Sequence, residues 1–302
     1  MARKRKGNPV HGWLVVDKPA GITSAAVVNK ARWALRAQKA GHTGTLDPAA
    51  TGCLVIGFGE ATKLIPVAQD GWKIYRFTVR WGEATDSDDA QGAVTGRSDL
   101  RPDRAAIVAA LPAFTGLIEQ VPPAVSAVKV DGTRAYQLAR RGEAVDLGAR
   151  PLRVDRLVLL DIPDRDHAVF ELVCGTGGYV RAVARDLGTA LGCLGHVRDL
   201  HRDATGPFDL SGAFDMADFD RVRAAEADVA LLPLEAGLAD LAPVEISAAQ
   251  AADLRLGRAV VITGRTPGDG RAWARHAAKV VALGTLTGRA FQPDRVIVRD
   301  PG

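Results

Sequence analysis

Short apolar blocks separated by polar turns run along this chain, and they predict a protein of mixed α and β structure. Apolar runs or period-two alternation, which are typical of strands, occur at Trp13–Val16, Leu54–Ile56, Ile74–Trp81, Leu157–Ile162 and Ala168–Cys174. Apolar residues at helical spacing occur at Thr23–Leu35, Glu60–Val67, Asp103–Leu111 and Tyr179–Leu191. Because strands and helices do not alternate regularly, we expect an α+β fold with a mixed, largely antiparallel sheet.

A change of composition near residues 236–244 predicts a boundary between a large domain and a small one. Ser247 and Gln250 have the spacing of a capping box, which opens a short helix that Gly257 closes. Strands are expected at Val260–Thr263, Lys279–Leu283 and Arg295–Val298, with a flexible loop at 263–276. We therefore predict a basic tail at 1–10, a large domain at 11–240, and a small β-rich module at 241–302 that docks on the large domain.

The composition favours a globular protein of a reducing compartment. The chain has 302 residues, 47% of them hydrophobic, which is enough for a sizeable core. It contains no run of eighteen apolar residues, so no membrane span is expected. The basic segment Met1–Lys6 lacks the apolar run of a secretory signal. Three cysteines without a CxxC pair predict no disulfide framework, and we expect a cytoplasmic protein.

Positive charge is concentrated in the first quarter of the chain. Residues 1–72 contain ten Lys or Arg and four Asp or Glu, an excess of six against four for the whole chain. Such a surface favours a polyanionic partner, because basic side chains release counterions when they bind phosphates. The alternative for the first six residues alone is a solvated tail. The basic residues nearest to the glycine-rich loop described next are Lys18, Lys30, Arg32, Arg36, Lys39 and Lys63.

Residues 41–52, with the sequence GHTGTLDPAATG, form the segment most suggestive of chemistry. One carboxylate, Asp47, stands among small and hydroxylated residues, and Pro48 restricts it to an extended backbone. The segment has no apolar periodicity, and His42 lies five residues upstream of the carboxylate. The alternative is an ordinary Asp-Pro turn.

Several other classes of site are not supported by the sequence. Asp86, Asp88 and Asp89 suggest a calcium loop, but the required glycine and terminal glutamate are absent, so a solvated hairpin turn is predicted. The glycine-rich segments lack a complete phosphate-binding fingerprint, no serine or cysteine sits in a nucleophile elbow, and the six histidines lack HExxH spacing. We therefore expect neither a metal nor a cofactor.

Two later segments combine glycine turns with aromatic and basic residues. Gly175–Arg181 presents Tyr179 and Arg181 just after a glycine-rich turn, and residues 120–141 include Lys129, Arg140 and Arg141. A tyrosine can stack on a base, and an arginine can hold a carboxylate. As alternatives, Tyr179 is a core aromatic residue and Arg181 an exposed residue at a helix start.

The order and spacing of these segments resemble the TruB family of bacterial tRNA pseudouridine(55) synthases, which modify the TΨC loop. The resemblance extends from about residue 11 to about residue 210, and a weaker one relates the tail after residue 243 to the family's small PUA-like RNA-binding module. The segments that carry it are Asp17–Pro19 with Thr23-Ser24, Gly41–Gly52, Gly59–Lys63, Tyr75, Gly82–Gly92, Pro122–Lys129, and Gly177–Arg181 with Asp186–Gly188.

The resemblance implies a pseudouridine synthase fold in which Asp47 is the catalytic aspartate and Arg181 pairs with it, so that opposite charge keeps the carboxylate ionised. The substrate contacts that it implies are His42, which fills the space left by the flipped uridine, Tyr75, which stacks on uracil, a second active-site tyrosine at Tyr179, and Leu200, which lines the base pocket. It also implies a mobile insertion at about 124–152 that closes on RNA. Candidate contacts to the RNA backbone are Lys18, Lys63, Lys129, Arg140 and Arg141.

Two positions depart from the family pattern. Gly178 stands where threonine is usual, and His201 stands where an arginine commonly follows the leucine. We expect the first change to loosen the turn that holds Tyr179, and the second to remove a fixed positive charge near the pocket.

The expected activity is the isomerisation of uridine-55 in tRNA, which rejoins C5 of uracil to C1′ in place of N1 and needs no redox cofactor. The uridine must leave the folded loop, and stacking on Tyr75 offsets part of that cost. The alternative is a non-catalytic tRNA-binding or tRNA-folding protein that uses the same basic cleft; a second is a relative that needs guide RNA. We expect the T-arm of tRNA as the partner, no guide RNA, no membrane, and a monomer.

Overall fold

A computed structural model describes residues 7–126, 128–130, 132–135, 138, 141, 147–225 and 229–298. The strands of the large domain are β1 (Gly12–Lys18), β2 (Ala40–His42), β3 (Thr51–Phe58), β4 (Lys73–Trp81), β5 (Glu83–Thr85), β6 (Val94–Arg97), β7 (Gly116–Gln120), β8 (Lys129–Val130), β9 (Thr133–Arg134), β10 (Arg150–Asp164), β11 (His167–Cys174), β12 (Gly195–Thr205), β13 (Phe208–Asp209) and β14 (Phe214–Asp215). Its α-helices are α1 (Ser24–Ala34), α2 (Ala61–Ala68), α3 (Arg104–Ala110), α5 (Val180–Ala190) and α6 (Phe219–Ala225). Short 3-10 helices lie at η1 (Leu111–Phe114), η2 (Met216–Asp218) and η3 (Leu234–Leu238).

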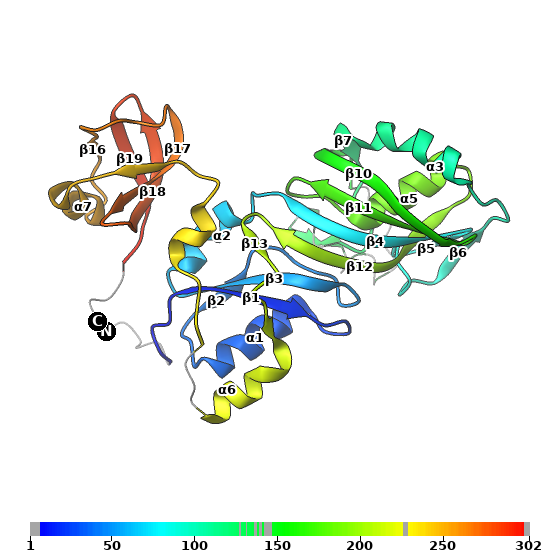
Figure 1. Cartoon of the computed structure of the whole chain (residues 1–302), viewed down its shortest axis with the longest axis horizontal. Helices are drawn as coiled ribbons and strands as arrows, with labels where there is room; N and C mark the ends of the chain where they lie inside the picture. Colours follow the sequence, from blue (N-terminus) through cyan, green and yellow to red (C-terminus); the bar gives the residue numbers. More distant parts are fainter. Residues whose placement is uncertain are drawn as a thin grey trace.

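One long sheet forms the centre of this domain (Figure 1). Its main path is β14-β1-β3-β12-β4-β11-β10-β7, with β13 paired to β12 and β2 to β3. In this sheet β1 with β14 and β3 with β12 are parallel pairs, and the other described pairs are antiparallel. The predicted α+β class with a mixed, largely antiparallel sheet is therefore confirmed.

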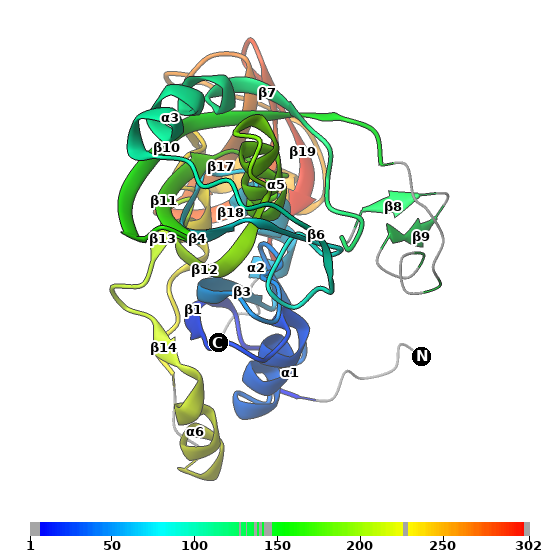
Figure 2. The same ribbon diagram turned by 90° about the vertical axis from the view of Figure 1, so that its right-hand side faces the viewer.

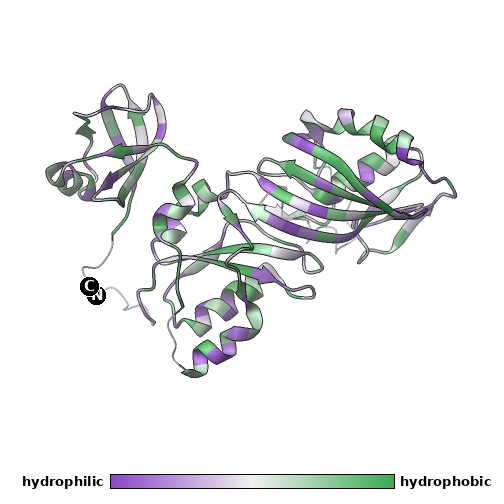
Figure 3. Cartoon of the chain, in the orientation of Figure 1, coloured by the Kyte–Doolittle hydropathy of each residue, from purple (hydrophilic) through white to green (hydrophobic). Residues whose placement is uncertain are grey.

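Two groups of helices cover the two halves of the sheet, and each group encloses its own core. Under one half, α1 and α6 pack on β1 and β3 around residues such as Leu54 and Phe219. These two helices carry both hydrophilic and hydrophobic residues along their length (Figure 3). On the other half, α5 packs on β4 and β12, where Tyr75, Phe77 and Val79 face the helix. The short β8–β9 hairpin lies to one side of the sheet (Figure 2).

Local sequence signals fix the helix starts as expected. The Thr23 hydroxyl accepts a hydrogen bond from the Ala26 amide at the start of α1, and the Asp103 carboxylate caps α3 in the same way. In the C-terminal module, Ser247 and Gln250 form both bonds of the predicted capping box on α7 (Ala248–Arg255). Side-chain caps act over three residues, which is why sequence alone predicts them.

The C-terminal module is a second sheet of five strands in the order β15-β17-β18-β19-β16. Its core is continuous with that of the large domain, because Trp273, Leu283 and Ile297 belong to the same buried cluster as Trp13 and Leu64. The expected docking on the large domain is thus present. The strands are β15 (Pro243–Glu245), β16 (Val260–Val261), β17 (Gly270–His276), β18 (Lys279–Thr287) and β19 (Ala290–Val296).

Two elements differ from expectation. Residues 270–276, part of the predicted flexible loop, form the inner strand β17, and the polar segment 195–205 forms the long strand β12. Ala272, Trp273 and Ala274 are buried in succession because both faces of β17 are covered, so no alternation marks this strand. In β12, two register shifts interrupt the period of two. Within the described residues, no helix is long and apolar enough to cross a membrane.

Candidate active site

The glycine-rich segment forms a loop between β2 and β3 that is fixed from below by buried polar groups. The Ser24 hydroxyl donates to the Leu46 carbonyl (2.9 Å) and accepts from the Leu46 amide (2.8 Å). The guanidinium of Arg202 donates through Nη2 to the Gly44 carbonyl (3.1 Å) and through Nε to the Cys53 carbonyl (2.8 Å). Each of these bonds joins a side chain to the backbone and fixes the course of the loop, and Asp47 on this loop stays partly exposed.

Lys18 belongs to this support, and the prediction that it contacts RNA phosphates is contradicted. Its side chain is buried, and Nζ donates to the carbonyls of Pro19 (2.9 Å), Pro48 (3.1 Å) and Ala50 (2.6 Å). Burial lowers the pKa of the ammonium to about 8, although the nearby Asp47 carboxylate opposes this. This lysine therefore ties the second half of the Asp47 loop to the turn that follows β1.

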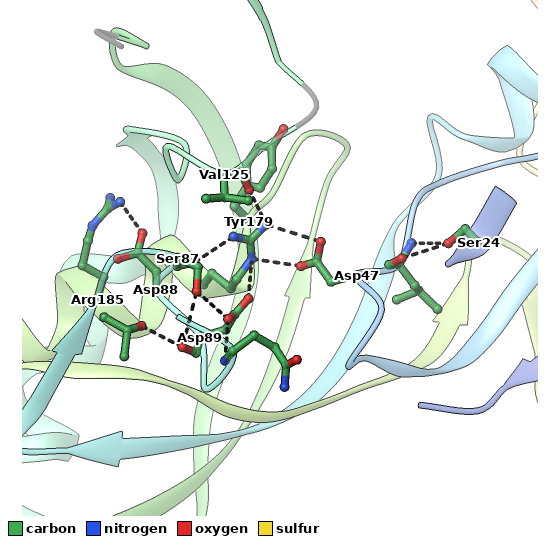
Figure 4. A network of polar contacts seen from close by, with 12 residues as sticks. Ser24, Asp47, Ser87, Asp88, Asp89, Val125, Tyr179 and Arg185 are labelled. Carbon is green, nitrogen blue, oxygen red and sulfur yellow. Dashed lines mark hydrogen bonds and ion pairs between the residues drawn. The ribbon is translucent and has the colours of Figure 1, made fainter. Parts of the chain in front are cut away.

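Asp47 and Arg181 meet as the resemblance implies. Arg181 Nε donates to Asp47 Oδ2 (2.9 Å) and Nη2 donates to Oδ1 (3.3 Å), which is a two-point contact. The arginine side chain is only 6% exposed, whereas the carboxylate is 37% exposed. The alternative in which Arg181 is an exposed helix-start residue is therefore wrong. In Figure 4, the dashed lines that end on the labelled Asp47 carboxylate mark these two contacts.

The remaining donors of Arg181 reach two other segments. Nη1 donates to the Ser87 carbonyl (2.8 Å), and Nη2 also donates to the Val125 carbonyl (2.9 Å). The Asp89 carboxylate lies 3.7 Å from Nε and accepts from the Ser87 hydroxyl (2.6 Å). One guanidinium thus joins the catalytic loop, the acidic turn and the insertion.

The acidic turn itself is not the solvated hairpin that was predicted. Its carboxylates at Asp88 and Asp89 are 13% and 17% exposed, and they face arginines of α5. Burial raises the pKa of the Asp88 carboxyl, although its partner Arg185 opposes the shift. Nothing near this turn in the sequence indicates its burial, because the arginines that pair with it are nearly one hundred residues away.

A small pocket that is partly open to solvent lies beside the carboxylate. Leu200 of β12 forms part of its wall, as the resemblance implies, and packs against both cores of the large domain. The residues that line it are Asp47, Ala49, Ala50, Asp89, Ala90, Arg181, Val197, Arg198 and Leu200. One wall is thus charged and another apolar, which suits a flat polar base.

Tyr75 and His42 lie deeper than the carboxylate. Tyr75 is 8% exposed on β4, and burial raises its pKa, while the positive charge of Arg202 opposes this. His42 ends β2, and burial together with the charge of Arg202 lowers its pKa, so the ring is uncharged at neutral pH. No described residue hydrogen-bonds its Nδ1 atom. Arg202, whose sequence context reveals only a positive charge, therefore organises this floor.

Tyr179 stands at the start of α5 and is clamped through its backbone. The Gln120 side chain donates to the Tyr179 carbonyl (3.1 Å) and accepts from its amide (2.9 Å). The ring packs on Val128, Ala135 and Leu147 of the insertion. Tyr179 is only partly buried at the edge of this cluster, and it precedes Arg181 by two residues. It is therefore not a fully buried core residue.

The two departures from the family pattern have local compensation. A Cβ atom at Gly178 would approach Cys174 Sγ to 2.8 Å and Leu152 to 3.2 Å, so neighbouring side chains fill the space. Together with the Gln120 clamp, this packing contradicts the expected loosening of the turn. His201 Nδ1 lies 2.8 Å from the Thr51 hydroxyl, and a fixed guanidinium follows at the next position, Arg202.

The other candidates for RNA contact have different surroundings. Lys63 Nζ is one third exposed and bonds Glu60 Oε2 (2.6 Å) and the Val296 carbonyl of the C-terminal module (2.9 Å). Arg141 is exposed. The side chain of Lys129 and the whole of Arg140 lie outside the described residues.

Comparisons with known proteins agree with this geometry. Residues 32–180 match the family model for the N-terminal domain of TruB family pseudouridylate synthases, and residues 181–239 match that for the tRNA pseudouridylate synthase B C-terminal domain. The chain is 54% identical over 301 residues to tRNA pseudouridine synthase B of Ruegeria pomeroyi, covering 99% of each chain. It is 53% identical to the same-named protein of Paracoccus denitrificans, covering 98% of this chain and 99% of that one.

Solved structures share the architecture. An H/ACA ribonucleoprotein bound to a substrate RNA containing 2′-deoxyuridine includes a chain that superposes with a TM-score of 0.75 at 21% identity, covering 100% of this chain and 92% of that one. A chain of an archaeal box H/ACA ribonucleoprotein complex gives the same TM-score and identity, covering 100% and 94%. The predicted fold, including the β-rich C-terminal module, is confirmed. By its matches to close relatives along nearly its whole length, the chain belongs to the TruB family of pseudouridylate synthases.

Proposed function

We propose that this chain isomerises uridine-55 in the TΨC loop of tRNA to pseudouridine, with Asp47 as the catalytic group. The observation that carries the proposal is the carboxylate of Asp47, held at two points by the buried Arg181 beside an open pocket. A buried arginine that fixes a half-exposed carboxylate orients it toward whatever enters the pocket. The names of the close relatives support tRNA as the substrate.

The reaction needs the base to leave the RNA stack. The flipped uracil would enter between the carboxylate and the apolar wall at Leu200, with Tyr75 beneath it. The neutral ring of His42 suits the space that the uridine vacates, because an uncharged ring can stack on bases. Tyr179 would border the site from the insertion side.

The chemistry exchanges one glycosidic bond for another within the same nucleotide. The N1–C1′ bond breaks, the uracil turns, C5 bonds to C1′, and the proton of C5 is removed as N1 gains one. A carboxylate serves such a reaction either by adding to the sugar or base or by abstracting a proton. The two-point contact with Arg181 keeps Asp47 in place through each of these steps.

The partner that we propose is the T-arm of tRNA, bound by a monomer in the cytoplasm without a guide RNA. Lys63 lies beside the C-terminal module and retains an exposed portion for a phosphate. Lys129, Arg140 and Arg141 remain proposed contacts of the insertion, and the module after residue 241 remains a proposed second RNA-binding unit. Phosphate contacts of this kind give affinity that falls with salt.

The test is a single-turnover assay on an unmodified tRNA transcript, with pseudouridine mapped chemically. Wild type and Asp155→Asn, which changes an exposed carboxylate on β10, are expected to form product at the TΨC uridine. Asp47→Asn is expected to bind tRNA and form none. Tight binding without product from wild type would instead support the non-catalytic tRNA-binding or tRNA-folding protein.

A further inference from the structure

A second arginine on α5 makes contacts that the proposed chemistry does not use. Arg185 lies one helical turn after Arg181, so the two side chains share a face of the helix. Its Nη1 donates to Asp88 Oδ2 (2.9 Å), its Nη2 to the Val121 carbonyl (2.8 Å), and its Nε to Asp186 Oδ1 (2.8 Å). Figure 4 shows Arg185 beside Asp88 at the end of the network opposite to Asp47.

The two arginines hold the same two segments at neighbouring points. On the acidic turn, Arg181 binds the Ser87 carbonyl and Arg185 binds the next residue, Asp88. On the segment that leads into the insertion, Arg181 binds the Val125 carbonyl and Arg185 binds the Val121 carbonyl. A segment attached at one point can rotate about it, whereas a segment attached at two points cannot.

Asp88 is built into the turn in a way that its backbone alone would not favour. Its φ is 59°, a left-handed value that side chains rarely adopt and that aspartate tolerates better than most. Its carbonyl accepts from the Val197 amide (3.1 Å), and the Ala90 amide donates to the Val197 carbonyl (2.9 Å). The acidic turn is therefore fixed to β12, the strand that also forms the pocket wall.

We propose that Arg185 and Asp88 are positioning residues for the isomerisation. Their contact fixes the positions of the acidic turn and of the segment at 121–125 relative to α5. The carbonyls of Ser87 and Val125 then keep the Arg181 guanidinium in the orientation that binds both oxygens of Asp47. The pair touches neither the carboxylate nor the pocket. This inference rests on the proposed function, because its effect is on the rate of that reaction.

The variants that test it avoid new strain. Asp88→Asn retains tolerance for the left-handed backbone while it removes the charge, and Arg185→Gln removes the guanidinium from a half-exposed helix position. Under single-turnover conditions at saturating tRNA, we expect each variant to lose about 10- to 100-fold in rate, the scale of a small misplacement of reacting groups. The double variant should be no slower than Arg185→Gln alone, because both changes cut the same link.

Two further variants separate positioning from general damage. Arg185→Lys retains one donor group and should recover about 3- to 10-fold of the loss, since a single charged hydrogen bond replaces a fork. Asp186→Asn removes a contact of the same arginine that reaches neither segment, and its rate should stay within about 2-fold of wild type. Thermal unfolding of every variant reports whether it folds.

A readout independent of activity is amide hydrogen exchange in the free protein. Arg185→Gln and Asp88→Asn should exchange faster in residues 85–93 and 121–125 than wild type, while residues 12–18 of β1 stay unchanged. Asp186→Asn should match wild type in all three. The inference is supported if exchange is faster in both segments and the reaction rates fall in the order expected for the four single variants.

The inference would be overturned by unchanged exchange in both segments, or by rates that fall only in proportion to the folded fraction. Additive losses in the double variant would also contradict it. If wild type itself forms no pseudouridine, the proposed function fails. The exchange result then decides whether the pair still fixes the two segments.

Discussion

The loop that carries Asp47, the proposed catalytic residue, and the interface with the C-terminal module are held by opposite kinds of interaction. The loop at 43–50 is anchored by directional polar bonds from Lys18, Ser24, Arg181 and Arg202. The module is anchored by apolar side chains that share a core with the large domain, among them Leu283. Its polar bonds to the large domain, such as those of Lys63 and Glu60, lie at partly exposed positions.

The difference follows from what each region must do. Apolar burial is strong in proportion to area but does not specify direction, so it suits a module that only has to remain attached. Hydrogen bonds and ion pairs add little net stability but fix angles and distances. They suit a carboxylate that must meet a substrate atom within a fraction of an ångström.

The largest expected effect is a loss of reaction rate when the hydrogen bonds from Arg181 to the Asp47 carboxylate are weakened. In Arg181→Lys, one ammonium replaces a fork that binds Asp47 twice and two carbonyls once each. We expect the single-turnover rate to fall about 100- to 1,000-fold, the size of losing preorganised charged contacts. Melting temperature serves as the control for folding, and a rate within threefold of wild type would contradict the comparison.

The next effect should act on the apolar interface. Leu283→Ala leaves a cavity in the shared core, where the side chain is fully buried, and should lower the free energy of unfolding by about 3 kcal/mol. The rate at saturating tRNA should stay near that of wild type, because no bond to the catalytic loop is lost. The exposed Val261 of the same module gives the matched control, Val261→Ala. A slow but stable Leu283→Ala would show that the module also positions the site.

A smaller change in stability is expected at the base of the catalytic loop. Lys18→Met removes the donor of the Pro19 and Ala50 carbonyls and leaves Pro48 with the Gly21 amide alone, which should cost about 2 kcal/mol. The single-turnover rate should also fall, in contrast to Leu283→Ala. Chemical denaturation beside the kinetic assay tests both, with the exposed Lys279→Met as control.

The same lysine predicts a pH dependence. Its pKa is about 8 in the folded chain and 10.5 ordinarily, so between these values the unfolded chain binds more protons and stability rises with pH. The stability of wild type relative to Lys18→Met should therefore increase from pH 8 toward pH 10. If the stability of wild type relative to Lys18→Met decreased from pH 8 to pH 10, the lowered pKa of Lys18 would be contradicted.

The smallest effect is expected at the polar rim of the interface. The Glu60 carboxylate accepts from the Val298 amide (2.9 Å) and pairs with the partly exposed Lys63. Glu60→Gln should change the free energy of unfolding by about 0.5 kcal/mol, as for other partly solvated pairs. Denaturation at low and high salt measures it, and a loss as large as that of Leu283→Ala would show that the interface depends on its polar bonds.

Sequence was a good guide wherever the deciding interaction is short in range or the motif is distinctive. The capping box at Ser247 and the alternating strand β4 appear as expected, and the helices expected from residues 23 and 103 start at side-chain caps. The block around Asp47 and the segment at Tyr179–Arg181 indicated the family. Through that resemblance they also predicted the contact between Asp47 and Arg181, which are 134 residues apart. These are the features that adjacent residues encode.

Tertiary structure decided which charged residues are buried. Lys18 resembles a surface lysine in the sequence, yet backbone carbonyls from the Asp47 loop surround its ammonium. Asp88 and Asp89 resemble a solvated turn, yet arginines of a distant helix lie against them. The strands β12 and β17 were hidden because bulges and two-sided burial remove the period of two. The sequence by itself determined the family, the helix starts with local caps, and the pairing of Asp47 with Arg181. Which charged groups are buried depends on partners that only the folded chain brings close. The free-energy cost of desolvating a charge is offset by the contacts that the group makes, and its residue type alone does not reveal them.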